Sequence, residues 1–168
     1  GQLGCDCILI ANDKVPGDIL RKNALKLAKP PETKLVMKTV EDSIEAINSG
    51  VTDKYKLFVI VETVEDARRM VEGCSVFERV NLGNVRMYAG AKQLGSTVFV
   101  SEKDMEDIRV MQAKGVSVDV QSIPRDKRTE VKAYGGRRNV SMDRSFIDRS
   151  GGRTCKLDLS WNYYKNTV

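Results

Sequence analysis

Histidine is absent from the 168 residues of this sequence. Histidine is the commonest general base in enzymes, a common metal ligand and an acceptor of phosphoryl groups. Its absence excludes a Ser-His-Asp triad and a Cys-His nucleophile within these residues. Any chemistry performed by this chain must therefore use another group.

Long hydrophobic runs and the familiar phosphate-binding glycine motifs are also missing. No stretch approaches the roughly 18 to 20 apolar residues that span a bilayer, and the opening GQLGCDCILIAND lacks the basic start of a signal peptide. Neither G-x-x-x-x-G-K-[ST] nor G-x-G-x-x-G occurs, which weakens a nucleotide-binding interpretation. We therefore expect a soluble protein of about one domain that uses no cofactor.

Cysteine is scarce, with four residues at positions 5, 7, 74 and 155. Cys5 and Cys7 form C-x-C rather than the C-x-x-C of a redox or zinc site, and no second Cys/His pair completes a metal site. We interpret the four as reduced thiols, which predicts a cytoplasmic protein without a metal site.

The net charge of +5 is concentrated near the C-terminus. Residues 135–168 hold seven Lys/Arg and three Asp/Glu, whereas residues 1–134 carry a net charge of only +1. A nucleic-acid-binding surface combines a basic face with stacking aromatic residues, so we expect no nucleic acid as the main partner. We divide the chain into a body, 1–134, and a basic segment, 135–168.

Apolar runs and helix-capping signals alternate along the body. Ile8–Ala11 and Leu57–Val61 are predicted as buried strands. Pro16 opens one predicted helix, in which Leu20, Ala24, Leu27 and Ala28 have helical spacing, and Thr39, Thr63 and Ser101 begin three others. This alternation predicts an α/β fold: a doubly wound, mostly parallel sheet with helices on both faces, in a single domain.

Polar residues follow several of the predicted strands. Ligands of open parallel sheets bind outside the carboxyl ends of the strands. We therefore predict an active-site edge in which polar strand ends are joined by the long loop Asn81–Gln93. It consists of Asn12, Asp13, Gly83, Asn84 and Arg86. Each alone is also an ordinary turn residue, and that alternative stays open.

Six segments, in order and at these spacings, carry a resemblance to a known family. They are ILIANDKV, VEDSIEAINSG, LFVIVETVEDARRMVEGC, VNLGNVRMYAGAKQL, STVFVSEKDMEDI and KGVSVDVQSIPRD. Residues from about 3 to 130 resemble the IIB subunit of the mannose/fructose/sorbose class of the bacterial phosphoenolpyruvate-dependent sugar phosphotransferase system (PTS).

The resemblance implies a cytoplasmic phosphocarrier associated peripherally with a membrane sugar transporter. Such a subunit accepts a phosphoryl group on histidine from a IIA phosphodonor. It passes the group to a sugar that enters through the membrane partners IIC and IID, and it often self-associates. The acceptor histidine lies in a motif like R-I-D-x-R-L-I-H-G-Q, just after the family's first strand.

This sequence departs from that pattern, because it begins beyond the motif. In one interpretation a circular permutation lets segment 135–168 supply the first strand and phosphate loop. Asn139–Met142 would then pair between the strands at 8–11 and 57–61. The histidine position would fall near Ser150 or Gly151, and the phosphate would be bound by Arg144, Arg149, Gly152 and Arg153. In the other interpretation the segment is an unrelated basic extension.

Three functions are consistent with these residues. The first is a IIB phosphocarrier or an altered derivative, with little or no phosphotransfer because Ser150 would form a stable ester. The second is a non-catalytic module that binds PTS partners. The third is anion or nucleic-acid binding through the basic segment.

Overall fold

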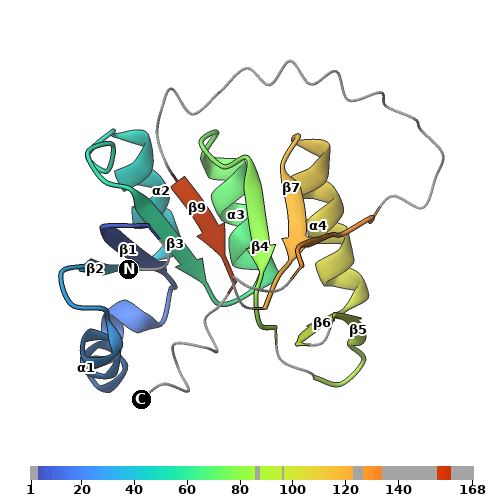
Figure 1. Ribbon diagram of the computed structural model, residues 1–168, viewed down its shortest axis with the longest axis horizontal. Coiled ribbons are helices and arrows are strands. Elements are labelled where there is room, and N and C mark those ends of the chain that lie inside the picture. The colour runs from blue at the N-terminus through green and yellow to red at the C-terminus, as the bar shows by residue number, and fades with distance from the viewer. Residues whose placement is uncertain (1–3, 86–87, 96, 123–126, 134–154, 160–168) are drawn as a thin grey trace.

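The computed structural model describes residues 4–85, 88–95, 97–122, 127–133 and 155–159 (Figure 1). Within these ranges, seven strands form one sheet in the order β2-β1-β3-β9-β4-β7-β8, in which only β8 is antiparallel to its neighbour. The strands are β1 Cys7–Ala11, β2 Lys34–Lys38, β3 Leu57–Val61, β4 Arg79–Leu82, β7 Ser117–Val120, β8 Thr129–Glu130 and β9 Cys155–Asp158. A separate hairpin pairs β5, Lys92–Gly95, with β6, Val98–Val100.

Each α-helix begins at a side-chain cap. The helices are α1 Ile19–Ala28, α2 Val40–Asn48, α3 Val64–Gly73 and α4 Glu102–Ala113. Thr39, Thr63 and Ser101 accept hydrogen bonds from the backbone N–H groups three residues later, as the sequence predicts. Asp18 caps α1, while Pro16 lies in a preceding 3-10 turn, Val15–Gly17.

The two faces of the sheet have different helical cover. α2, α3 and α4 share one core cluster with the sheet, and Figure 1 shows them together behind it. We call this side the three-helix face. The 3-10 turn and α1 pack on the opposite side, the α1 face, where Val15 and Leu25 join Ile8, Ile10 and Phe58. The doubly wound α/β fold is confirmed.

β9, which consists of four residues of the basic segment, lies in the middle of the sheet. It pairs in parallel with β3, from Leu57 opposite Cys155 to Ile60 opposite Asp158, and with β4 on its other side. β1 and β3 pair directly over five residues. The predicted insertion of Asn139–Met142 between those two strands is therefore wrong, since the position is already closed; these four residues themselves lie outside the described ranges.

α1 forms where its apolar spacing predicts a helix, but it buries little of that spacing. Leu20 and Leu27 are each 83% exposed, and Ile19 is 73% exposed. Leu25 is the buried residue of this helix. Helical periodicity thus located the element but not the side that packs.

Candidate functional site: the carboxyl edge of the sheet

The carboxyl ends of the parallel strands meet along one side of the sheet, which we call the carboxyl edge. Because neighbouring parallel strands point the same way, the residues that follow them gather at this side. The residues are Asn12 and Asp13 after β1, Glu62 after β3, Leu159 after β9, Gly83 and Asn84 after β4, and Gln121 and Ser122 after β7.

Asn12 is buried and all its side-chain polar atoms in this corner are engaged. Its Oδ1 accepts hydrogen bonds from the backbone N–H groups of Lys14, at 2.9 Å, and Val15, at 3.1 Å. Its Nδ2 donates to Oε2 of Glu62 over 2.6 Å. Asn12 therefore folds the chain back after β1 and ties β1 to the end of β3.

Asp13 connects the same corner to two helices on the three-helix face. Its Oδ1 accepts from the backbone N–H of Val40, at 2.9 Å, and its Oδ2 lies 2.8 Å from Nη1 of Arg69. These two partners lower the pKa of the Asp13 carboxyl, with the hydrogen bond from Val40 contributing most. Arg69 also contacts Asp66 at 3.2 Å, and burial raises the pKa of the Asp66 carboxyl.

The arginines of this corner face carboxylates. Arg69 bridges Asp13 and Asp66, and Nη1 of Arg21 lies 3.9 Å from Glu62 and near Asp18. A phosphate bound by either guanidinium would have to displace one of these carboxylates, because both are anions that use the same donors. This corner is therefore a preformed polar surface and not an open anion-binding site.

A second corner lies beyond β4 and β9. The backbone N–H of Asn84 donates to the carbonyl of Leu159 over 3.1 Å. Thr97 donates its hydroxyl to the carbonyl of Gly83, at 3.1 Å, and shares a further hydrogen bond with the hydroxyl of Ser122. Here the polar groups are neutral hydroxyls and backbone atoms.

Asn81 and Asp158 lie side by side just inside this corner, on β4 and β9. Nδ2 of Asn81 donates to Oδ2 of Asp158, at 2.9 Å, and to the carbonyl of Gln121, at 3.1 Å. Both partners are acceptors, so the amide orientation is determined by the contacts. Asn81 thereby links β4, β9 and the end of β7 and helps to hold the inserted strand in place.

The predicted site residues thus fall into two corners of one edge. Asn12 and Asp13 follow β1, whereas Gly83 and Asn84 follow β4, with β3 and β9 between them. Three inter-strand spacings separate the corners by about 14 Å. Outside the described residues lie Arg86, Arg144, Arg149, Ser150, Gly151, Gly152 and Arg153.

Glu62 and Arg69 are the main polar residues of this edge that the sequence analysis missed. Glu62 directly follows a buried strand, as Asn12 does, so the strand-end rule that selected Asn12 would also have selected it. Arg69 had no comparable signal, because it lies inside α3 and meets Asp13, 56 positions earlier, only in the folded chain.

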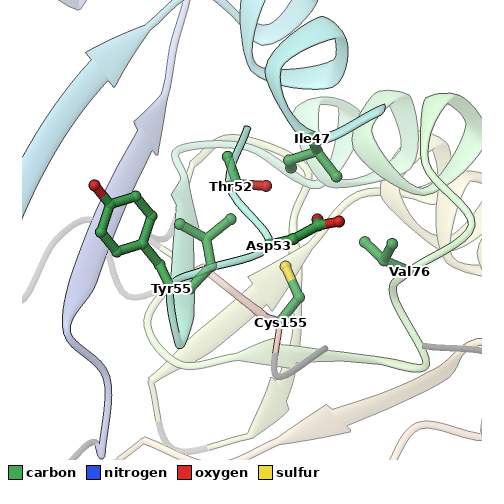
Figure 2. Close-up of a pocket in the computed structure, with 7 residues that line it drawn as sticks. Ile47, Thr52, Asp53, Tyr55, Val76 and Cys155 are labelled. Atoms are coloured by element: carbon green, nitrogen blue, oxygen red, sulfur yellow. The ribbon is translucent and has the colours of Figure 1, made fainter. Parts of the chain in front are cut away.

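A small cavity beside β9 contains a thiol and a carboxylate but offers no reaction site. Figure 2 shows Cys155 and Asp53 there with Ile47 and Val76, while Tyr55 points away from Cys155. Its volume is about 10 Å³, barely that of one water molecule. Burial raises the pKa of Cys155 to about 12 and that of Cys74 to about 11, so both stay protonated at neutral pH and are poor nucleophiles.

Among the described residues, no group of three or more His, Cys, Asp or Glu side chains is placed to hold a metal ion. Within the same ranges, no helix has the length and apolar character needed to cross a membrane.

Most of the chain matches a known protein family. Residues 2–145 match the family described as "PTS system sorbose subfamily IIB component". β9 lies beyond this match, so the strand at the centre of the sheet comes from outside the matched region.

Curated relatives and solved structures agree with the family match. The chain is 28% identical to the N-acetylgalactosamine-specific phosphotransferase enzyme IIB component 1 of Escherichia coli K12, over 77% of this chain and 82% of that protein. It is 26% identical to the mannose-specific EIIAB component of the same strain, over 74% of this chain but only 38% of that longer protein.

The crystal structure of the N-acetylgalactosamine-specific IIB component 1 from E. coli superposes with a TM-score of 0.72, at 27% identity, over 78% of this chain and 86% of that one. The IIBSor domain of the sorbose permease from Klebsiella pneumoniae gives 0.70 at 24% identity, over 74% and 77% of the two chains, and supports the fold alone.

Proposed function

Since the chain belongs to the sorbose-subfamily IIB components of the PTS, we propose that it docks with the IIA phosphodonor of such a system through the carboxyl edge, and that these 168 residues carry no phosphohistidine. The observation that supports this most directly is a IIB-family sequence of 168 residues without histidine. In this proposal the chain docks with IIA but does not transfer a phosphoryl group.

The available side chains support the absence of phosphoryl transfer. A phosphocarrier needs an acceptor that gives up its phosphoryl group readily, and serine or threonine esters hold it too firmly to relay it. The thiols of Cys74, which is buried, and Cys155, which is half-buried, have raised pKa values, and Cys155 lies at the start of β9, away from the carboxyl edge. Asp13 is occupied by Val40 and Arg69.

The ordered corner around Asp13 supports docking with IIA through the carboxyl edge. Its hydrogen bonds and ion pairs connect the loop after β1 with α2 and α3, so the surface is shaped before a partner arrives. The name of the mannose-specific relative, EIIAB, joins IIA and IIB in a single chain, which makes IIA the first partner to test. As a IIB component the chain would also meet the membrane subunits IIC and IID, at the cytoplasmic side.

The test is reconstitution with phosphoenolpyruvate, the general PTS phosphotransfer proteins and a purified IIA, using radiolabelled phosphoenolpyruvate. The matched control is the E. coli N-acetylgalactosamine IIB component 1. We expect acid-labile label on the control and none on this chain, while calorimetry shows both binding IIA. Stoichiometric acid-labile phosphate on this chain would overturn the absence of transfer, and absence of IIA binding would overturn the docking.

We also propose that the basic segment binds an anion through Arg144, Arg149, Gly152 and Arg153. Supporting this, residues 135–168 carry a net charge of +4, and guanidinium groups with glycine amides are the usual phosphate ligands. The measurement is a phosphate titration followed by NMR, with Arg149→Gln and Arg153→Gln as variants and Arg109→Gln as the control. Equal phosphate affinity in all three variants would contradict this assignment.

A further inference from the structure

A second, larger cavity lies on the three-helix face, between β2, β1 and the end of α2. Its volume is about 140 Å³. The apolar part of its lining comes from strand residues and from the helix, chiefly Leu9, Val36, Ala46 and Leu57. A cavity of about 150 Å³ with an apolar lining is large enough for a benzene ring. Size and lining therefore fit a small apolar group.

Three lysines surround this apolar lining. Lys34 and Lys38 lie at the two ends of β2, and Lys54 comes from the loop before β3. Within the described parts of the chain, none of the three forms an ion pair with a carboxylate. The carboxylate of the same loop, Asp53, lines the small cavity of Figure 2 instead. The cavity therefore combines an apolar interior with a rim of uncompensated positive charge.

Tyr55 positions two of these lysines. Its hydroxyl accepts a hydrogen bond from Nζ of Lys34 at 2.8 Å, and the ammonium groups of Lys34 and Lys54 lie 4.8 Å and 5.3 Å from the centre of its ring. The hydrogen bond raises the pKa of the Lys34 ammonium and lowers that of the Tyr55 phenol. The side chain of Lys34 is exposed, and its contact with Tyr55 places its ammonium beside the cavity.

From the apolar cavity and its three lysines without a carboxylate partner among the described residues, we propose that this cavity binds a small amphipathic carboxylate, with an aromatic or short aliphatic body inside and its carboxylate at the lysine rim. The cavity involves the starts of β1, β2 and β3 through Cys7, Lys34 and Leu57. Most of the lining therefore lies toward the end of the strands opposite the Asn12 and Asp13 corner, although Lys38, at the end of β2, is next to Asn12. Ligand binding here does not depend on the proposed docking with IIA.

The direct test is a titration of the isotope-labelled full chain, followed by two-dimensional NMR, with 3-phenylpropionate as the probe. 3-Phenylpropionamide is the matched probe, because it keeps the apolar body and removes the charge. We expect saturable shifts at Val36, at the loop 51–55 and at Leu57, with a dissociation constant on the order of millimolar for a ligand of this size. The amide should bind about fivefold more weakly or worse.

Variants separate the two parts of the site. Ala46→Met fills the cavity from α2, and we expect it to weaken binding by about tenfold or more. Lys38→Gln and Lys54→Gln should each weaken binding of the carboxylate by about threefold, as for an exposed ion pair, and leave binding of the amide unchanged. Lys26→Gln, on α1 and on the other face, is the charge-matched control and should have no effect.

Three outcomes would overturn the proposal. The first is an absence of saturation up to the solubility limit of 3-phenylpropionate, and the second is equal affinity for the acid and the amide. The third is unchanged affinity in an Ala46→Met protein whose spectrum shows that it is folded. If Ala46→Met does not fold, the paired comparison of Lys54→Gln with Lys26→Gln decides the question, since equal affinities would exclude the lysine rim as the carboxylate site.

Discussion

The two faces of the sheet differ in how far their apolar side chains extend across the strands. On the three-helix face, apolar side chains run continuously from β1 through β3, β9 and β4 to β7, and α2, α3 and α4 cover them. On the α1 face the apolar cluster is confined to β2, β1 and β3. Beyond β3 the strands present polar side chains there, including Asn81, Asp119 and Asp158.

β9 shows the same contrast within four residues. Cys155 and Leu157 point into the large core of the three-helix face, whereas Lys156 and Asp158 alternate to the other side. A strand buried on both faces of a parallel sheet is usually apolar throughout. β9 instead presents apolar side chains to the three-helix face and polar side chains to the α1 face, where Asp158 accepts a hydrogen bond from Asn81.

The two faces should contribute unequally to stability. Because most of the buried apolar surface lies on the three-helix face, that face should dominate the free energy of unfolding. The carboxyl edge consists of loop residues that follow the strands, and we expect partners to bind there. Single substitutions on the two faces and at the carboxyl edge test this division.

Leu157→Asp tests the apolar side of β9 and should have the largest effect. Leu157 is 2% exposed at the centre of the sheet, and a carboxylate there would have no partner in the surrounding core. We expect a loss of about 4 kcal/mol or more in the free energy of unfolding, measured by urea denaturation. Lys156→Gln, on the polar side of the same strand, is the control and should cost less than about 1 kcal/mol. Similar losses for both variants would contradict a two-sided β9.

Met70→Ala and Leu25→Ala compare the helical layers directly. Met70, on α3, is fully buried in the large core, whereas Leu25, on α1, is 6% exposed in the smaller one. We expect the free energy of unfolding to fall by about 4 kcal/mol for Met70→Ala and by about 2 kcal/mol for Leu25→Ala, because the tighter environment leaves the larger cavity. A larger loss for Leu25→Ala would reverse the proposed division.

Asp13→Asn tests the link between the carboxyl edge and the three-helix face. The substitution removes the charge that Arg69 contacts, and we expect a loss of about 1 kcal/mol at neutral pH for this partly exposed pair. Folding lowers the pKa of Asp13, so its contribution is present above the ordinary pKa of 3.8 and disappears as the pH falls through the lower folded value. Urea denaturation between pH 7 and about pH 3 should show the two proteins converging in acid.

Asp66→Asn is the control for that pH series, because folding shifts the pKa of Asp66 in the opposite direction to that of Asp13. Burial raises the pKa of Asp66, so its ionisation costs stability as the pH rises from its ordinary value of 3.8 through the higher folded value. The difference between wild type and this variant should therefore shift in favour of the variant as the pH rises through that window. Identical pH dependence for Asp13→Asn and Asp66→Asn would contradict the opposite environments assigned to the two carboxyls.

Leu27→Gln should have the smallest effect, although it replaces a leucine. Leu27 is 83% exposed on α1, so little apolar surface is lost from the folded state. We expect the free energy of unfolding to change by less than about 0.5 kcal/mol in the same urea experiment. A loss comparable to that of Leu25→Ala would show that the outer side of α1 is covered in solution.

Much of this architecture could be predicted because its signals are local. Each capping residue that begins a predicted helix needs only the next turn of the chain, and Thr39, Thr63 and Ser101 cap as expected. The buried strands Cys7–Ala11 and Leu57–Val61 are short apolar runs, and both are fully buried. The candidate edge followed from the same strands, since Asn12 and Asp13 come directly after the first of them.

The remaining features depend on contacts between residues far apart in the sequence. Arg69 reaches Asp13 across 56 positions, and Asn81 reaches Asp158 across 77. The lysine-rimmed cavity likewise combines β2, α2 and the loop before β3, none of which looks unusual alone. No local pattern marks such partners, because their contacts exist only after the sheet has formed.

Local composition and residue order are enough to identify the family and to predict the alternation of strands and helices, and the lack of histidine is read directly from the residues. The strand order required the folded chain: Cys155–Asp158 pairs between β3 and β4, whereas β1 and β3 pair with each other where Asn139–Met142 was predicted to insert. The physical reason is that strand order follows from which edges remain unpaired once all the other strands and helices have packed. β1 and β3 satisfied each other's backbone groups, and the open place lay one strand further along.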